Sequence, residues 1–387
     1  MRVVSKIAVV VATAAITIGA GIGPALADPP SGTLPKLTDV VGVGSDTTQL
    51  VMDAIAKHFD GTSPAHKLYS WDALNPSTGV AGDTIVTKGS SSSDMTCSMA
   101  RPNGSSGGIK ALAATIKDAG SPCIDYARSS RGTQTGDPTG LLWVGYAKDA
   151  VSWTTPKSGS GKPTTLTVAQ LTAIYLCTST KWNQVGGSST ATIVPVLPQP
   201  NSGTRAFFLK QIGVTTPGSC VVNGTISPAG NPHDPLPIEE NTGVSQKDSS
   251  GFYTTGNQLE FGNANTIFPY SVADWIAQTP KPAGGGHATA SSAPGVLKQP
   301  QKVKSVSPIA VHTGLIDTIN TAFTSTLTRV VWNVMPNAGT TAAPKIPANL
   351  LPFFGHTGAV CSDTADIKSY GFLPLTGQLC GTLFQAS

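Results

Sequence analysis

The stretch that most constrains the fold is residues 199–210, where a turn of proline, asparagine, serine and glycine runs directly into an apolar segment. Gly203 favours the turn, and Ser202 or Thr204 can cap a helix that starts there. The free N–H groups of such a helix start carry partial positive charge and bind oxyanions. Arg205 lies in the first turn, where a cation opposes the helix dipole, which makes sense if an anion lies there. An ordinary capped surface helix is the alternative.

Two earlier segments repeat this pattern. A glycine and hydroxyl turn that contains Asp46 and Thr47 lies between an apolar strand at 40–43 and a helix at 49–59. A second turn at 101–108 precedes a helix at 109–116. Further strands are predicted at 123–127, 141–146, 150–153, 191–197 and 330–334, and further helices at 167–176 and 315–323, with a strand-to-helix segment at 267–277. Strands that alternate with helices predict an α/β architecture.

The N-terminus has the features of a secretion signal. Arg2 and Lys6 flank an apolar run from residue 7 to about residue 20, and Ala25-Leu26-Ala27 forms a small-x-small cleavage site. The run is too short for a membrane span, and no later stretch reaches the required ~20 apolar residues. We therefore expect cleavage after Ala27 and a soluble protein that is secreted to the extracellular space or the cell envelope.

The charge of the chain is low. Charged residues make up 12% of the chain, about half the usual share. The formal charge is +4, and loss of Arg2 and Lys6 with the signal leaves +4 − 2 = +2. This balance argues against nucleic acid as a partner.

The glycine and hydroxyl turns together resemble the phosphate-binding proteins of ABC importers, which are type 2 periplasmic binding proteins. The most specific parts are Gly104-Ser105-Ser106-Gly107-Gly108 and Ser202-Gly203-Thr204, each before a helix, and the likeness covers most of residues 40–335. The resemblance implies a two-lobe α/β fold with a hinge of crossing strands. It also implies a monomeric binding protein without cofactor or catalysis, which closes on phosphate or a related oxyanion and delivers it to a membrane permease.

The resemblance also implies a division of the chain. After the signal peptide (1–27), residues 28–145 form the first part of lobe I and residues 146–265 form lobe II. Residues 266–387 return to lobe I, with a Gly/Pro/Ala-rich insertion near 280–302, which is expected to be exposed, and a cysteine-containing C-terminal tail.

All six cysteines follow the cleavage point, and an even count in an exported chain predicts three disulfides. Sequence alone permits 15 pairings. Pairing of sequence neighbours is favoured because each such pair falls inside one provisional lobe: Cys97 with Cys123, Cys177 with Cys220, and Cys361 with Cys380. No metal site is expected, because there is no Cys-x-x-Cys and the histidines are scattered.

The ligand set implied by the resemblance is Asp46, Thr47, Ser105, Ser130, Ser202, Gly203, Thr204 and Arg205. Two positions depart from the family. Ser130 stands where the family has an acid that accepts a hydrogen bond from protonated phosphate. The family's arginine before the Ser-Gly-Thr turn is replaced by Leu197-Pro198-Gln199. Asp46 can serve as the acceptor, and Arg205 or Arg128 can supply positive charge.

Two roles of Asp46 stay open. If its side chain points inward, phosphate is favoured, because monobasic phosphate can donate a hydrogen bond to an acid. If Asp46 only caps its helix, sulfate-like ions or another small solute become competitive. For Arg128 and Arg131 we expect a solvated surface position or a pairing with Asp125.

Two other classes of function compete with transport. Low charge and many Ser and Thr residues suit a secreted adhesion or matrix protein equally well. A secreted hydrolase is less favoured, since the sequence has no Gly-x-Ser-x-Gly, no Ser-x-x-Lys with its partner motifs and no His-Glu-x-x-His. Glu239 and Glu240 lie in a Pro-rich loop and are predicted to be solvated, because adjacent carboxylates rarely face one site.

Overall fold

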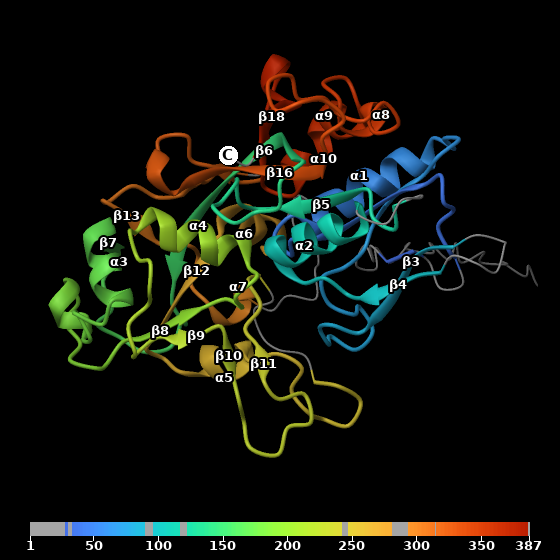
Figure 1. Ribbon diagram of the computed structural model, residues 1–387. Helices are drawn as coiled ribbons and strands as arrows, with labels where there is room; N and C mark the ends of the chain where they lie inside the picture. Colours follow the sequence, from blue (N-terminus) through green and yellow to red (C-terminus); the bar gives the residue numbers. More distant parts are fainter. Residues whose placement is uncertain are drawn as a thin grey trace, which may run out of the picture.

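A mixed sheet of ten strands runs through the computed structural model, with helices against it (Figure 1). The structure describes residues 28–29, 33–89, 96–116, 122–241, 247–280, 293–313 and 315–385. The strand order is β2-β1-β5-β16-β6-β12-β8-β9, and β17 and β18 also pair with β6. These strands are β1 (Val40–Gly44), β2 (Leu68–Ser70), β5 (Tyr126–Ser129), β6 (Leu141–Thr154), β8 (Val194–Leu197), β9 (Val222–Asn223), β12 (Thr266–Ser271), β16 (Thr328–Pro336), β17 (Leu373–Pro374) and β18 (Thr382–Gln385).

The two longest strands hold the sheet together. β16 pairs antiparallel with β6 over its whole length and with β5 on its other side. The last residues of β6, from Val151 to Thr154, pair antiparallel with β12. Strand β12 in turn pairs with β8. The strands β6 and β16 thus join the β1 side of the sheet to the β8 side. The predicted α/β fold with crossing strands is confirmed, whereas the lobe boundaries at residues 145 and 265 stay predictions.

The helices follow the apolar periodicity of the sequence. In α1, for example, Val51, Met52, Ile55 and Ala56 are buried, as expected for one face of a helix. The helices are α1 (Gln49–Gly61), α2 (Gly104–Ile116), α3 (Val168–Tyr175), α4 (Gly203–Gln211), α5 (Asn257–Gly262), α6 (Val272–Gln278), α7 (Ala293–Val296), α8 (Leu351–Phe354), α9 (Ala359–Ser362) and α10 (Thr364–Ser369), with 3-10 turns η1 (Trp182–Val185), η2 (Ser325–Leu327) and η3 (Gly377–Leu379). In the described part of the chain, no helix is long and apolar enough to cross a membrane.

Among the described residues, four strand pairs lie outside the main sheet. They are β3 (Thr84–Gly89) with β4 (Thr96–Ala100), β7 (Thr165–Leu166) with β13 (Lys302–Val303), β10 (Thr225–Ile226) with β11 (Leu236–Pro237), and β14 (Ile309–Ala310) with β15 (Thr318–Ile319). The cysteines pair as predicted, in the disulfides Cys97–Cys123, Cys177–Cys220 and Cys361–Cys380. The last of these disulfides closes the C-terminal tail, whose strands β17 and β18 extend the sheet on β6.

Three sequence predictions need correction. The predicted helix at 315–323 is absent: Ile319 is buried in β15, and Leu315 is 68% exposed. The two strands predicted at 141–146 and 150–153 are one continuous strand, β6. The predicted insertion at 280–302 is not exposed throughout, because Ala293 and Leu297 are fully buried. Residues 281–292 of this insertion and the signal peptide with its cleavage site lie outside the described residues.

Candidate functional site

The three hydroxyl-rich turns meet at one place. Thr47, which precedes α1, has its Oγ1 atom 3.0 Å from the Oγ1 atom of Thr204 in α4. Ser105 in the first turn of α2 accepts a hydrogen bond from the Ser130 backbone N–H at 3.0 Å, and the two serine Oγ atoms are 3.3 Å apart. Together with Ser202 and Gly203 these residues form a cluster that we call the hydroxyl cage: Thr47, Ser105, Ser130, Ser202, Gly203 and Thr204. All of its side chains are buried.

Gly203 closes the contact between the segments. A Cβ atom at this position would lie 2.2 Å from Ser105 Oγ and 2.4 Å from Ser130 Oγ, which is closer than real Cβ contacts. Any side chain at residue 203 would therefore push the two serines away. The short distance also shows that α4 begins directly against the first turn of α2.

The N-termini of α2 and α4 point at the same region. The Ser106 N–H donates to the Asn201 carbonyl oxygen at 3.0 Å, so the turn before α4 covers the start of α2; Figure 1 shows the two helices in the middle of the molecule. Ser202, one of the two predicted candidates, is the N-cap of α4, and its Oγ accepts from the Arg205 N–H at 2.9 Å. Both helix starts thus present polarised N–H groups close to the cage.

A carboxylate already fills the cage. Glu240 accepts hydrogen bonds from the Thr204 N–H at 3.0 Å, from the Thr47 N–H at 3.4 Å and from the Ser202 hydroxyl. The prediction that Glu239 and Glu240 are solvated is wrong, since both are fully buried. The Glu239 N–H donates to Asn257 Oδ1, and its carbonyl oxygen accepts from Asn257 Nδ2, both at 2.8 Å, so that the backbone turns inward here. No local sequence signal reveals this, because the anchoring partners come from other segments.

Asp46 lies beside this carboxylate. Burial and, second, the charge of Glu240 raise the pKa of Asp46 to about 7, although a hydrogen bond from the Asn241 backbone and the charge of Arg128 act in the opposite direction. Its Oδ2 atom is buried and has no hydrogen-bond partner in the described residues. Asp46 does not cap α1, whose N-cap residue is Thr48. The Asp46 carboxylate is instead close to that of Glu240.

Arg205 does not point into the cage, in contrast to its assignment in the ligand set. Its guanidinium donates to the Pro198 carbonyl oxygen at 3.0 Å and to Asn223 Oδ1 at 2.5 Å, which lie on the other side of the α4 start. A cation that does bond to the cage is Arg329 in β16, whose Nη2 donates to Thr204 Oγ1 at 2.9 Å and pairs with Asp149 at 2.7 Å. The sequence signal for Arg329 was its position as a charged residue directly before the apolar strand predicted at 330–334.

Arg128 and Arg131 are both buried, so the predicted surface positions are wrong, and neither pairs with Asp125. Arg128 donates to the Ser45 carbonyl oxygen at 3.1 Å and to Ser70 Oγ at 2.6 Å. It thereby links the turn between β1 and α1 to the end of β2. Arg131 forms an ion pair with Asp137 at 2.7 Å and also donates to Ser106 Oγ.

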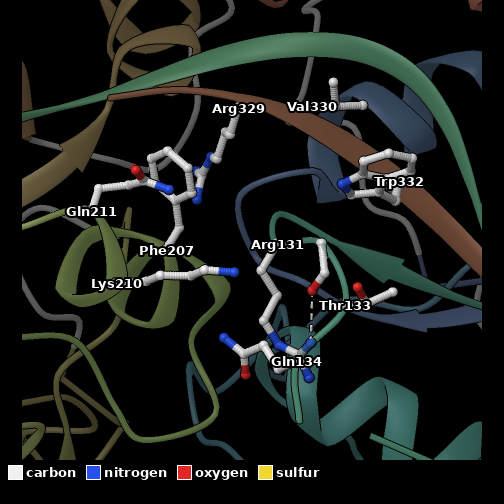
Figure 2. Close-up of a pocket in the computed structure, with 10 residues that line it drawn as sticks. Arg131, Thr133, Gln134, Phe207, Lys210, Gln211, Arg329, Val330 and Trp332 are labelled. Carbon is white, nitrogen blue, oxygen red and sulfur yellow. Dashed lines mark hydrogen bonds between the residues drawn. The ribbon is translucent and has the colours of Figure 1, made fainter. Parts of the chain in front are cut away.

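A pocket of about 200 Å³ shares Arg329 with the surroundings of the cage, since this residue lines the pocket and bonds to Thr204. Three cations line it, from three elements: Arg131 after β5, Lys210 on α4 and Arg329 on β16; we call it the cationic pocket. Figure 2 shows Lys210 extending towards Arg131 and Arg329 lying against Phe207, whose ring centroid is 5.6 Å from the guanidinium carbon. Arg329 links the pocket to the cage, because it lines the pocket and bonds to Thr204.

The family model for the PBP superfamily domain matches residues 29–349. The chain belongs to the PBP superfamily. Its fold is that of the type 2 periplasmic binding proteins. No curated protein matches the sequence.

Solved structures to which this chain is similar include those of three bacterial proteins. A putative phosphate ABC transporter substrate-binding protein from Clostridium perfringens has 16% identity and a TM-score of 0.50, over 87% of this chain and 100% of that one. An ABC-type phosphate transport receptor from Vibrio cholerae has 18% identity and a TM-score of 0.49, over 87% and 99%. A phosphate-binding protein from Stenotrophomonas maltophilia has 15% identity and a TM-score of 0.45, over 88% and 91%.

Proposed function

We propose that this protein is a secreted solute-binding protein that captures phosphate, or a related small oxyanion, in the hydroxyl cage and delivers it to the permease of an ABC importer. Binding takes place by closure of two lobes around the ion, without a chemical step. The observation that supports this proposal most strongly is that Thr47, Ser202 and Thr204, from two distant parts of the chain, direct their donors to one buried carboxylate. A site that holds a carboxylate in this way has the donors that a phosphate oxygen needs.

The family supports the same function. The chain is a member of the PBP superfamily, and the Clostridium perfringens protein of the same fold is described with bound phosphate. Asp46 replaces the acid that is missing at Ser130, because its buried, unpartnered Oδ2 can accept a hydrogen bond from a protonated phosphate. Arg329 replaces the missing arginine, since it reaches Thr204 from the central strand β16.

Calorimetric titration with phosphate and with sulfate tests the proposal. The double variant Ser202→Ala with Thr204→Val removes two cage hydroxyls, and because hydrogen bonds to a charged group contribute about 1.5–3 kcal/mol each, we expect phosphate affinity to fall by about 100-fold or more. Ser188→Ala with Thr190→Val has the same spacing on an exposed segment and should bind as the wild type does. The single variant Thr204→Val keeps the helix cap and separates loss of binding from loss of stability. Unchanged affinity in the double variant would place the ion elsewhere.

A further inference from the structure

The carboxylate of Glu240 takes the hydrogen bonds that the proposed function assigns to the bound ion. Its Oε2 atom accepts from the Thr204 N–H at 3.0 Å and from the Ser202 hydroxyl, and its Oε1 atom accepts from the Thr47 N–H at 3.4 Å. A phosphate oxygen would need the same donors, because they are the N–H and hydroxyl groups at the start of α4 and in the turn before α1. Glu240 and the ion therefore cannot occupy the cage at the same time.

Charge leads to the same conclusion. Glu240 is fully buried, and no ion pair of this carboxylate is found in the described part of the chain. Burial first, and then the charges of the neighbouring carboxylates, raise the pKa values of Asp46 and Glu239. An oxyanion in the cage would be repelled by the Glu240 carboxylate beside it. Moving the Glu240 side chain out of the cage removes both the steric conflict and the nearest negative charge.

The backbone on both sides of Glu240 is firmly held. Glu239 is bonded to Asn257 through both of its backbone groups, and the Asn241 carbonyl oxygen accepts from Tyr270 Oη and Gln278 Nε2, each at 2.8 Å. The side chain of Glu240 can thus leave the cage without loss of these anchors. Glu239 serves a different partner, since its Oε1 atom accepts from Asn103 Nδ2 at 2.8 Å.

Glu240 also joins the two sides of the site. The segment that carries it is bonded to the α4 side, because the Gln199 N–H donates to the Ile238 carbonyl oxygen at 2.7 Å. Through Thr47 the carboxylate reaches the turn before α1 on the opposite side. It thereby makes, without any solute, the type of bridge that a captured ion would make.

We propose that Glu240 is an internal ligand of the cage, which the incoming oxyanion has to displace. This inference rests on the proposed function. Glu240 lowers the affinity for the ion, because only the fraction of molecules with an empty cage is competent to bind. Glu240 thereby helps to set the ion concentration at which half of the protein molecules have bound the ion.

The test compares phosphate binding by the wild type, Glu240→Gln and Glu239→Gln in isothermal titration. Glu240→Gln keeps the size of the side chain but turns a charged acceptor into a weaker neutral one, so we expect the Kd for phosphate to fall by about tenfold or more. Glu239→Gln removes the neighbouring buried carboxylate and leaves Glu240 in the cage. The Kd for phosphate should therefore change less in this variant, within about threefold. Glu240→Ala provides the same test if the glutamine variant does not fold.

The possible results separate the two proposals. Tighter binding by Glu240→Gln than by Glu239→Gln supports the internal ligand. If the wild type binds phosphate and Glu240→Gln binds equally well or more weakly, the internal ligand is refuted and the proposed function stands, with Glu240 as a partner of the bound ion or a structural residue. If neither protein binds phosphate although both are folded, the proposed function fails and the internal ligand fails with it.

Discussion

The hydroxyl cage and the cationic pocket are connected through Arg329, yet they present different groups to an anion. The cage offers hydroxyl and backbone N–H donors, and the acids Asp46, Glu239 and Glu240 lie at or beside it. The pocket is lined by Lys210 and by Arg131 and Arg329, which pair with Asp137 and Asp149, next to an aromatic ring. Neutral donors in a dry site bind an oxyanion through fixed geometry, whereas cations at an opening attract anions over a distance. We therefore assign retention of the ion to the cage and its approach to the pocket.

Gly203→Ala should have the largest effect, because it acts on the geometry of the cage. The added methyl group would meet Ser105 Oγ at 2.2 Å and Ser130 Oγ at 2.4 Å, so the starts of α2 and α4 have to separate. Such overpacking costs about 1–3 kcal/mol, and we expect phosphate affinity to fall by about 100-fold or more. Gly262→Ala is the control, since a Cβ there meets nothing within 4 Å. Equal affinity of both variants would show that the close approach at residue 203 does not matter for binding.

The pH dependence of stability tests the acidic character of the cage and should be intermediate in size. The pKa of Asp46 is about 7 in the folded protein and 3.8 as its ordinary value, so the folded state binds the proton more tightly. The free energy of unfolding of the unliganded protein should therefore fall as pH rises from about 4 to about 7, by up to ~1.4 kcal/mol per pH unit from this group. The contribution of Asp46 to the free energy of unfolding is fully present below pH 3.8 and is lost as pH rises through about 7.

Asp46→Asn isolates this contribution. Chemical unfolding at several pH values should show that the variant lacks this part of the decline and is the more stable protein above pH 7, because its amide stays neutral. A constant difference between variant and wild type over this range would mean that Asp46 titrates normally and is not buried against Glu240.

Lys210→Gln should have the smallest effect, because it changes the approach of the ion and leaves the cage intact. Stopped-flow association of phosphate should slow by about twofold to threefold at low salt, and the difference should disappear at high ionic strength. Lys57→Gln removes an exposed charge from α1 outside the pocket and should bind at the wild-type rate. If both variants slow equally, net charge rather than the pocket governs the approach.

Much of the fold could be predicted because it depends on local sequence patterns. Glycine and hydroxyl turns before apolar periodic segments indicated α1, α2 and α4, and Ser202, one of the two candidate N-caps of α4, is the one that caps it. The helix expected at 315–323 failed because pairing of β14 with β15 overrides the weak helical pattern of that segment.

The residues of the site could be predicted where they lie in the turns that the sequence pattern marks. They could not be predicted where contacts with distant segments determine the position of the side chain. Thr47, Ser105, Ser130, Ser202, Gly203 and Thr204 converge as expected. Glu240 and Arg329 were missed, because the sequence does not show that Asn257 turns residue 239 inward or that β16 passes Thr204. The assignment of Arg205 failed for the same reason, since Asn223 holds its side chain away.

The most direct test is a crystal structure of the protein grown with phosphate. We expect the ion in the hydroxyl cage, within hydrogen-bond distance of Thr47, Ser202 and Thr204, with the Glu240 carboxylate displaced. A structure with phosphate bound only outside the cage, and Glu240 still bonded to Thr204, would contradict the assignment of this cage as the binding site.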